Sequence, residues 1–362
     1  MAHIMNLIGS AFRKPFEQVN TFMLSFSQMF YQAGSRKRRY LQFMTEKLSN
    51  KKATMAPNPC PTRWNSWFSA VQYHSQHFPL YKEFINEEVK TCGKSTLQSV
   101  DRLQEMLNNN DLAKKIQVQI NIIADKCKVI IRLLDIFQSR LPSTTKLFDY
   151  LEDLEMNFAA NTQLQLEGCA QYFEDLDLSF ATKNDILKSV EQAYNNAEEK
   201  LAKYMSHGQP AISFFKEVGV FNPQNVAFMS NTVSSYTSIP GFSTVPEEEM
   251  NLYFTHLGPA ALKASACGVV NLDVFWDGLQ ERLPVLSSLA KRYKDAVINS
   301  ADAERSNSIY KLVLCSRRRS TTNDHLKAFV FLYHNQRLTS GAFQRDEGEV
   351  DDFEDIEVMD EE

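Results

Sequence analysis

Apolar side chains recur through most of the chain at spacings of three and four residues, the period of one face of an α-helix. The most regular run predicts a single amphipathic helix over residues 111–140, about 45 Å long at a rise of about 1.5 Å per residue. Such a single stripe suits a coiled coil or the core side of a helix in a bundle, and we favour the bundle. Its apolar positions are Leu112, Ile116, Ile120, Ile123, Cys127, Ile130, Leu134 and Phe137.

The same period predicts further helices, over residues 3–31, 40–48, 64–91, 95–107, 144–165, 183–206 and 247–264. Three stretches depart from it. Residues 34–39 predict a basic turn, and residues 53–61, with three prolines, predict a connector. Residues 220–246 are rich in proline and serine and predict a polar, irregular segment. Because few segments alternate apolar and polar side chains as strands do, the sequence predicts a mainly α fold.

The last part of the chain predicts two more helices. Ser300 is a suitable N-cap, and Asp302 and Glu304 place negative charge on the first turn that follows it. The arginines at 317–319 lie where the C-terminal turn of a helix favours cations. An apolar run over residues 326–332 then predicts the second helix.

The composition sets the broad class of the protein. The 362 residues are 43% apolar, enough for a substantial core in two or three domains or in one elongated one. No segment approaches the roughly 18 consecutive apolar residues of a membrane span, and the N-terminus lacks the layout of a signal peptide. The six cysteines form no Cys-x-x-Cys pair, which argues against a zinc ribbon and favours a reduced, intracellular compartment.

Charge is distributed unevenly. Residues 346–362 hold eleven acids and no Lys or Arg, so the rest of the chain has 39 basic side chains against 33 of the 44 acidic ones, a net charge of +6. A cationic body fits contact with nucleic acid, although a solvated acidic tail on any soluble protein has the same composition. The basic run at 36–39 is read either as a nuclear localisation patch or as a solvated helix face.

Motifs of the common enzyme classes are absent from the sequence. There is no glycine-rich phosphate loop, no Gly-x-Ser-x-Gly elbow and no Cys–His pair. His74 and His77 lie three residues apart without a carboxylate or third ligand, so we expect solvated or packing residues and not zinc ligands. The sequence therefore indicates no small-molecule substrate.

Motifs in three parts of the chain resemble hAT-superfamily DNA transposases. The segment Thr62-Arg63-Trp64-Asn65-Ser66 matches the family's Thr-Arg-Trp-Asn-Ser signature. His3 and Asn6-Leu7 are similar to the His and Asn-Leu of a family stretch whose Cys would precede Met1. The last third resembles the family's C-terminal dimerisation region in its order of residues, which is Trp276, Leu283-Pro284-x-Leu286, Leu289-Ala290, Ser300-Ala301-x-x-Glu304-Arg305 and Asn335.

The resemblance implies an Asp-Asp-Glu metal site on an RNase H-like core, with Glu304 as its third acidic residue. The family's two catalytic aspartates lie upstream of the His and Asn-Leu stretch, so no residue of this chain matches them. Strand transfer needs two divalent ions, and one carboxylate cannot hold both. We therefore expect an inactive remnant that binds no cofactor alone, whereas an intact family member needs Mg²⁺ or Mn²⁺. Asn307 stands where the family usually has an aromatic residue.

The resemblance also implies DNA contact and dimerisation. Trp64 would stack on DNA, and Arg63 beside it can add a cation–π contribution. On local pattern alone, Trp64, Trp67 and Phe68 are read as anchors of the next helix in the core. Further DNA contacts are expected from Arg317, Arg318 and Arg319. The expected dimerisation residues are Trp276, Leu283, Pro284, Leu286, Leu289, Leu326 and Leu332.

The expected organisation is a large helical insertion domain attached to an incomplete RNase H-like core that lacks its first strands. Its parts are a core remnant over residues 1–50, an all-α insertion domain over 51–265, a dimerisation region over 266–345 and an acidic disordered tail over 346–362. The expected function is self-association with weak, non-specific DNA contact in the nucleus. The alternative is a domesticated helical scaffold or adaptor without a nucleic-acid role, in the nucleus or the cytoplasm. Neither function involves a membrane.

Overall fold

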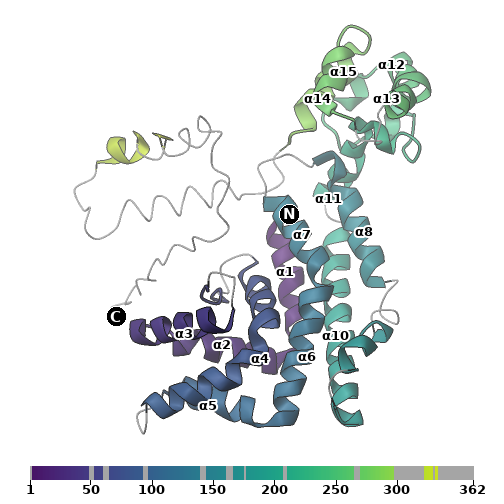
Figure 1. The fold of residues 1–362 in the computed structure, drawn as a ribbon. Coiled ribbons are helices and arrows are strands. Elements are labelled where there is room, and N and C mark those ends of the chain that lie inside the picture. The colour runs from purple at the N-terminus through teal and green to yellow at the C-terminus, as the bar shows by residue number, and fades with distance from the viewer. Residues whose placement is uncertain are drawn as a thin grey trace, which may run out of the picture. The chain divides into compact units, whose positions relative to one another are not determined.

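The structure is a computed structural model. Its described residues are mainly helical and include no β-strand, which confirms the mainly α fold (Figure 1). The chain divides into two compact units, one of Met1–Phe43 with Ala56–Asn299 and the other of Met44–Met55 with Ser300–Glu362. The residues that the structure describes are 2–48, 53–59, 65–92, 97–138, 144–159, 166–174, 177–206, 210–264, 270–296, 322–328 and 331–332.

The first three helices are α1 (Ala2–Arg13), α2 (Glu17–Met29) and α3 (Gly34–Lys47). The single helical stretch predicted over residues 3–31 is therefore interrupted, because Pro15 lies between α1 and α2 and Phe16 has φ −94° and ψ 56°. The basic turn predicted at residues 34–39 is wrong, since these residues form the first turns of α3. The proline-containing connector is confirmed over its described part, residues 53–59, which has no regular structure.

Four helices follow, namely α4 (Ser66–Cys92), α5 (Gln98–Asn108), α6 (Asn110–Lys126) and α7 (Lys128–Gln138). The helix predicted over residues 111–140 is thus two helices, which meet at Cys127 with φ −84° and ψ 2°. The apolar stripe does not reveal this break, because Ile123, Cys127 and Ile130 are all buried. The predicted break between α5 and α6 is confirmed: Asn109 caps α6 by accepting a hydrogen bond of 3.2 Å from its first turn.

The described part of the bundle also includes the helices α8 (Leu147–Ala159) and α10 (Phe180–Met205), together with the 3₁₀ turns η1 (Thr144–Lys146) and η2 (Ala170–Phe173). α1 packs against α10 and α7, so the start of the chain lies beside a helix that is distant from it in the sequence (Figure 1). α4 packs against α5 and α6. The side chain of Ser179 caps α10 by accepting a bond of 3.1 Å from the Thr182 N–H.

Aromatic rings fill the bundle between α2 and α4. The Phe26 ring lies 4.6 Å from that of Tyr81 and 4.9 Å from that of His74, centroid to centroid. His74 is only 1% exposed and shares a hydrogen bond of 2.9 Å with the Tyr81 hydroxyl. Burial, with a smaller contribution from nearby His77, lowers the pKa of His74 to about 3. The expected packing role is thereby confirmed for His74.

Glu88 of α4 pairs with two arginines of the basic run. Its carboxylate accepts hydrogen bonds from Arg36 Nε at 2.7 Å and from Arg39 Nη2 and Nε at 2.5 and 2.9 Å. Arg36 Nη1 also donates to the Met29 carbonyl at 2.5 Å. Since Arg36 is 7% exposed and Glu88 2% exposed, the interpretation of this run as a solvated helix face is wrong for Arg36.

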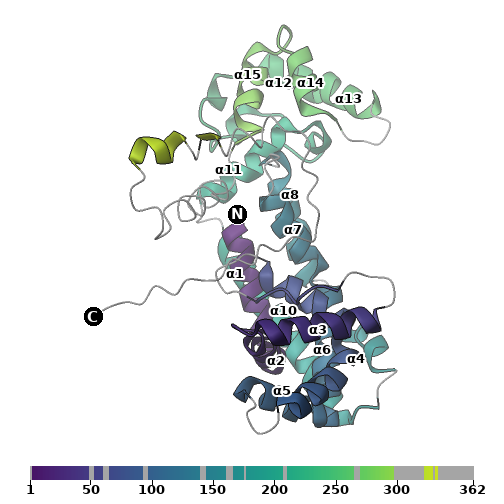
Figure 2. The ribbon, with the colours of Figure 1, turned by 60° about the vertical axis from the view of Figure 1, so that its left-hand side comes forward.

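The described residues between 210 and 293 form a lobe with its own core. Figure 2 shows α12 to α15 gathered in this lobe. Its irregular segment 220–246 agrees with the prediction, but it also supplies Phe221, Tyr236 and Phe242 to the core. The helices are α11 (Pro210–Val218), α12 (Glu247–Leu252), a π-helical turn (Tyr253–Leu257), α13 (Gly258–Ala264), α14 (Leu272–Gly278) and α15 (Pro284–Tyr293).

Hydrogen bonds from two buried side chains, Trp276 and Glu249, link separate elements of the lobe. Trp276 of α14 is fully buried, and its Nε1–H donates to the Phe221 carbonyl at 2.9 Å. Glu249 of α12 accepts from the Leu286 N–H at 2.8 Å and the Val285 N–H at 3.3 Å. The carboxylate thus supplies the N-terminal cap of α15 from a different helix, where negative charge is favourable.

Of the second unit, the structure describes short segments only. Residues 323–328 are helical. Leu326 is 8% exposed, whereas Phe331 and Leu332 are 68% and 63% exposed. The capped helix predicted after Ser300 and the acidic tail lie outside the described residues.

Candidate nucleic-acid interface at the start of α4

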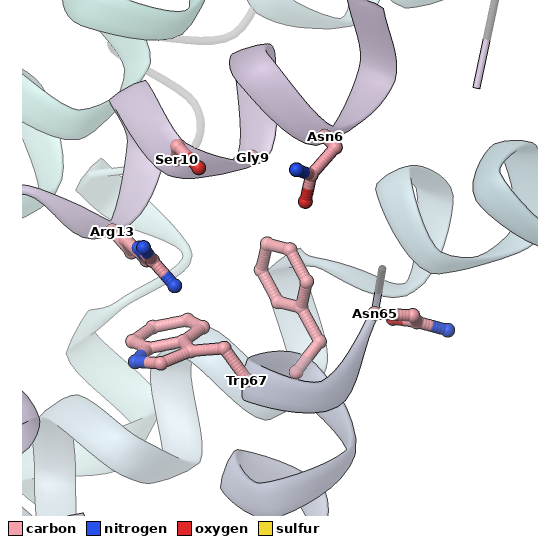
Figure 3. Close-up of a pocket in the computed structure, with 7 residues that line it drawn as sticks. Asn6, Gly9, Ser10, Arg13, Asn65 and Trp67 are labelled. Carbon is pink, nitrogen blue, oxygen red and sulfur yellow. The ribbon is translucent and has the colours of Figure 1, made fainter. Parts of the chain in front are cut away.

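A small pocket lies where α1 faces the first turn of α4 (Figure 3). Its cavity measures about 10 Å³, room for about one water molecule. It brings together Asn6 of the N-terminal stretch and Asn65 of the Thr-Arg-Trp-Asn-Ser segment, which are far apart in the sequence. The lining residues are Asn6, Gly9, Ser10, Arg13, Asn65, Trp67 and Phe68.

Gly9 permits the close approach of the two helices. A Cβ atom at this position would lie 2.8 Å from Cε2 of the Phe68 ring, closer than real Cβ contacts come. Because the ring is 5% exposed and packed, it has little room to withdraw. A glycine at residue 9 therefore sets the width of the pocket.

Asn65 makes the turn into α4 with φ 65°, a left-handed conformation that asparagine tolerates better than most residues. Its carbonyl accepts from the Ser69 N–H at 3.0 Å, and its Nδ2 donates to Asp135 at 3.4 Å. Its Oδ1 is buried, and no donor in the described part of the chain reaches it. Figure 3 shows the amide directed away from Trp67, so this side chain does not cap α4.

Trp67 fastens the start of α4 to the bundle. The indole is 6% exposed, and its Nε1–H donates to Asn20 Oδ1 at 2.8 Å. Asn20 in turn donates from Nδ2 to the Arg13 carbonyl at 3.3 Å. The reading of Trp67 and Phe68 as core anchors of this helix is confirmed, because both are buried.

Arg13 places a positive charge at the pocket. It is the last residue of α1 and is partly exposed, and burial lowers the pKa of its guanidinium without discharging it at neutral pH. No acid lies within ion-pair distance of it among the residues that the structure describes. α4 also has no acid in its first turn, so the positive end of its dipole adds to the same region. This positive charge favours an anionic group such as a phosphate at the surface beside the cavity, because the cavity itself has room for only about one water molecule.

A second, open hollow of about 510 Å³ lies between α4 and α6. Here Asp125 accepts from the Tyr172 hydroxyl at 2.7 Å and pairs with Lys128 at 2.6 Å. These bonds lower the pKa of the Asp125 carboxyl, and burial with the Asp125 bond raises that of Tyr172. Within the described ranges, no group of three His, Cys, Asp or Glu side chains could hold a metal ion.

Several residues assigned by resemblance lie outside the described part of the chain. They are Glu304, Arg63, Trp64, Arg317, Arg318 and Arg319. His3 is exposed. The structure does bring Asn6 and Asn65 to one pocket, which motif matching alone did not predict. Arg13 was missed altogether, since a single arginine at the end of an amphipathic helix carries no motif.

Most of the expected dimerisation residues lie in the core of their own chain. Trp276, Leu283 and Leu286 are fully buried, and Leu289 is 9% exposed. Pro284 is exposed at the first turn of α15. The apolar side chains that the lobe does present to solvent include Phe228 and Val274, which are 90% and 70% exposed. The assignment of these core residues to a dimer contact stays a prediction.

No protein-family model and no curated protein matches the chain, so the resemblance to hAT transposases rests on the motifs quoted above alone. Among the described helices, none has the length and apolar content to cross a membrane.

Proposed function

We propose that the chain is a hAT transposase-derived protein that acts mainly through self-association, with weak, non-specific DNA contact and no strand transfer of its own. The observation that carries the proposal is the pocket between α1 and α4. It joins Asn6 and Asn65, one from each of two stretches that resemble the family, beside an arginine without an acidic partner in the described structure. In the proposal, residues 1–50 are the remnant of an RNase H-like core.

The DNA contact is proposed at phosphates. Arg13 and the first turn of α4 supply positive charge, and Arg63 and Trp64 immediately precede Asn65 in the sequence. Phosphate contacts position DNA without reading its bases, so the expected binding is independent of sequence and falls with salt. Arg317, Arg318 and Arg319 would add to it.

Self-association is proposed through the lobe. Because Trp276, Leu283 and Leu286 are buried in the lobe's core, they would shape its surface and not form the contact themselves. Phe228 and Val274 present apolar area to solvent, and in the proposal a second copy of the chain covers these two side chains. An adaptor that binds a different protein would use the same side chains.

No catalysis is proposed, because Glu304 is the only residue that matches a catalytic position of the family. One carboxylate does not hold two divalent ions, so Mg²⁺ or Mn²⁺ would bind only with carboxylates from elsewhere. Cleavage of transposon-end DNA by this chain with Mn²⁺, abolished by Glu304→Ala, would overturn this part of the proposal.

A salt titration tests the DNA contact. The full chain and the variants Arg13→Gln and Arg102→Gln are titrated with duplex DNA, Arg102 being an exposed arginine on α5. We expect Arg13→Gln to weaken binding and to lower the slope of log K against log salt by about 0.9, the value for one lost phosphate contact. Arg102→Gln should leave the slope unchanged. Identical curves for the wild type and Arg13→Gln would remove Arg13 from the interface.

Light scattering tests self-association. We expect a dimer that Phe228→Ser or Val274→Ser shifts toward the monomer. A dimer that shows no affinity for DNA at low salt would favour the scaffold alternative. A monomer at every concentration would contradict the proposed self-association.

A further inference from the structure

The basic run at 36–39 is built into the helix bundle. Arg36 and Arg39, three residues apart, lie on one side of α3 and share the Glu88 carboxylate. The side chain of Glu88 is 1% exposed and that of Arg36 9%. Removing one partner of such a buried pair leaves an uncompensated charge in the core, which strongly disfavours separation.

An aromatic anchor follows the run directly. Tyr40 is fully buried, and its ring lies 5.1 Å from the rings of both Phe30 and Phe84, centroid to centroid. Its hydroxyl shares a hydrogen bond of 2.8 Å with that of Tyr73. The chain therefore cannot leave the bundle at the basic run without also exposing this tyrosine.

Only part of the run faces solvent. Lys37 is partly exposed and Arg38 exposed, whereas Arg36 is buried. A receptor that takes basic side chains from an extended peptide needs consecutive residues spaced by about 3.3 Å, whereas a helix advances about 1.5 Å per residue. The folded chain offers neither this spacing nor all four charges.

We propose that the run Arg36–Arg39 is a concealed recognition sequence for acidic-groove receptors that bind extended basic peptides, the class that carries proteins into the nucleus. The hydrogen bonds of Glu88 with Arg36 and Arg39 keep the run in its helical, packed form. The receptor binds only the fraction of molecules in which α3 has left the bundle, and its apparent affinity falls by that fraction. Nuclear entry of the folded chain therefore does not use this run.

Digestion with trypsin tests whether the run is inaccessible in the folded chain. Like the proposed receptor, trypsin requires an extended segment that contains Lys or Arg. The full chain is digested under native conditions, and cleavage within residues 36–39 is measured relative to cleavage at Lys200 of α10, which normalises for global unfolding. We expect Glu88→Gln to raise this ratio at least about tenfold, as loss of a buried pair implies. The matched change Glu87→Gln, at an exposed neighbour, should leave it unchanged. Equal ratios for Glu88→Gln and the wild type would overturn the proposal.

A cellular measurement tests recognition by the receptor, first with the buried pair intact and then with Glu88 replaced. Full-length chains fused to a large fluorescent reporter are compared by nuclear fraction. We expect Lys37→Ala combined with Arg38→Ala to leave the wild-type fraction unchanged, because the run is not read in the folded chain. In a Glu88→Gln background the nuclear fraction should rise, and the same double change should reverse the rise. Loss of nuclear accumulation from the double change in the wild-type background would overturn the proposal, as would no rise with Glu88→Gln.

Discussion

Acidification from pH 7 to pH 5 should destabilise the helix bundle through His74. This imidazole is buried between α2 and α4, beside the rings of Phe22 and Phe26 at 5.4 and 4.9 Å. Burial lowers its pKa to about 3. In the unfolded chain the ordinary pKa of histidine, about 6.5, applies. Between these two values the unfolded state binds more protons than the folded state, so stability falls as the pH falls.

The size of the effect follows from the two pKa values. At pH 5 protonation stabilises the unfolded chain by about 2 kcal/mol through this one residue, against about 0.2 kcal/mol at pH 7. The folded chain gains almost nothing at either pH, because its His74 remains neutral well above pH 3. The expected loss is therefore about 2 kcal/mol between pH 7 and pH 5.

Urea denaturation followed by far-ultraviolet circular dichroism measures this loss. Wild type, His74→Phe and His77→Gln are each unfolded at pH 7, 6 and 5. His74→Phe keeps a ring against Phe26 and removes the titrating group, so its free energy of unfolding should fall by about 2 kcal/mol less than that of the wild type. His77→Gln is the control and should retain the wild-type dependence on His74. Equal pH dependence of the wild type and His74→Phe would refute the reasoning.

Three further substitutions test the packing that positions the pocket and the lobe. Glu249→Gln weakens the cap of α15 and should cost about 1–2 kcal/mol of stability in urea denaturation, whereas Glu248→Gln, at an exposed neighbour, should be neutral within about 0.5 kcal/mol. Gly9→Ala places its Cβ 2.8 Å from the Phe68 ring, so the thermal midpoint should fall even though alanine favours helix. Trp276→Phe leaves a buried carbonyl without its donor and should cost about 1–3 kcal/mol in chemical denaturation; an unchanged midpoint would contradict the buried bond.

The apolar period predicted most helices of the bundle because it records which side chains face the core. It did not predict where one helix ends and the next begins when the side chains at the break still face the core. Cys127 ends α6 while remaining buried, so the stripe continues through the break. The same limitation hid the core role of residues 220–246, where buried side chains such as Phe221 lie on 3₁₀ turns without a regular period.

The sequence did not predict which charged residues form ion pairs when they lie far apart along the chain. The basic run at 36–39 suggested a solvated face because Glu88, its partner, lies some fifty residues later in the chain and in no motif. At the candidate interface, the match at Asn65 drew attention to the start of α4. The roles of the Arg13 charge and of the missing side chain at Gly9 depend on the packing of α1 against this turn, which no motif records.

The cap that Glu249 provides has a consequence for modularity. α15 has ten residues, a length that is marginal for an isolated helix, and its first turn is completed by a carboxylate of α12. The buried cluster of the lobe likewise draws on both sides of the boundary predicted between residues 265 and 266. A chain ending at residue 265 would retain Glu249 but lose Trp276 and the amides that Glu249 binds. Recombination, truncation or domain exchange at that point would therefore divide one folding unit. A fragment or fusion that is meant to fold should keep the lobe's core residues, from Val218 to Ala290, in one piece.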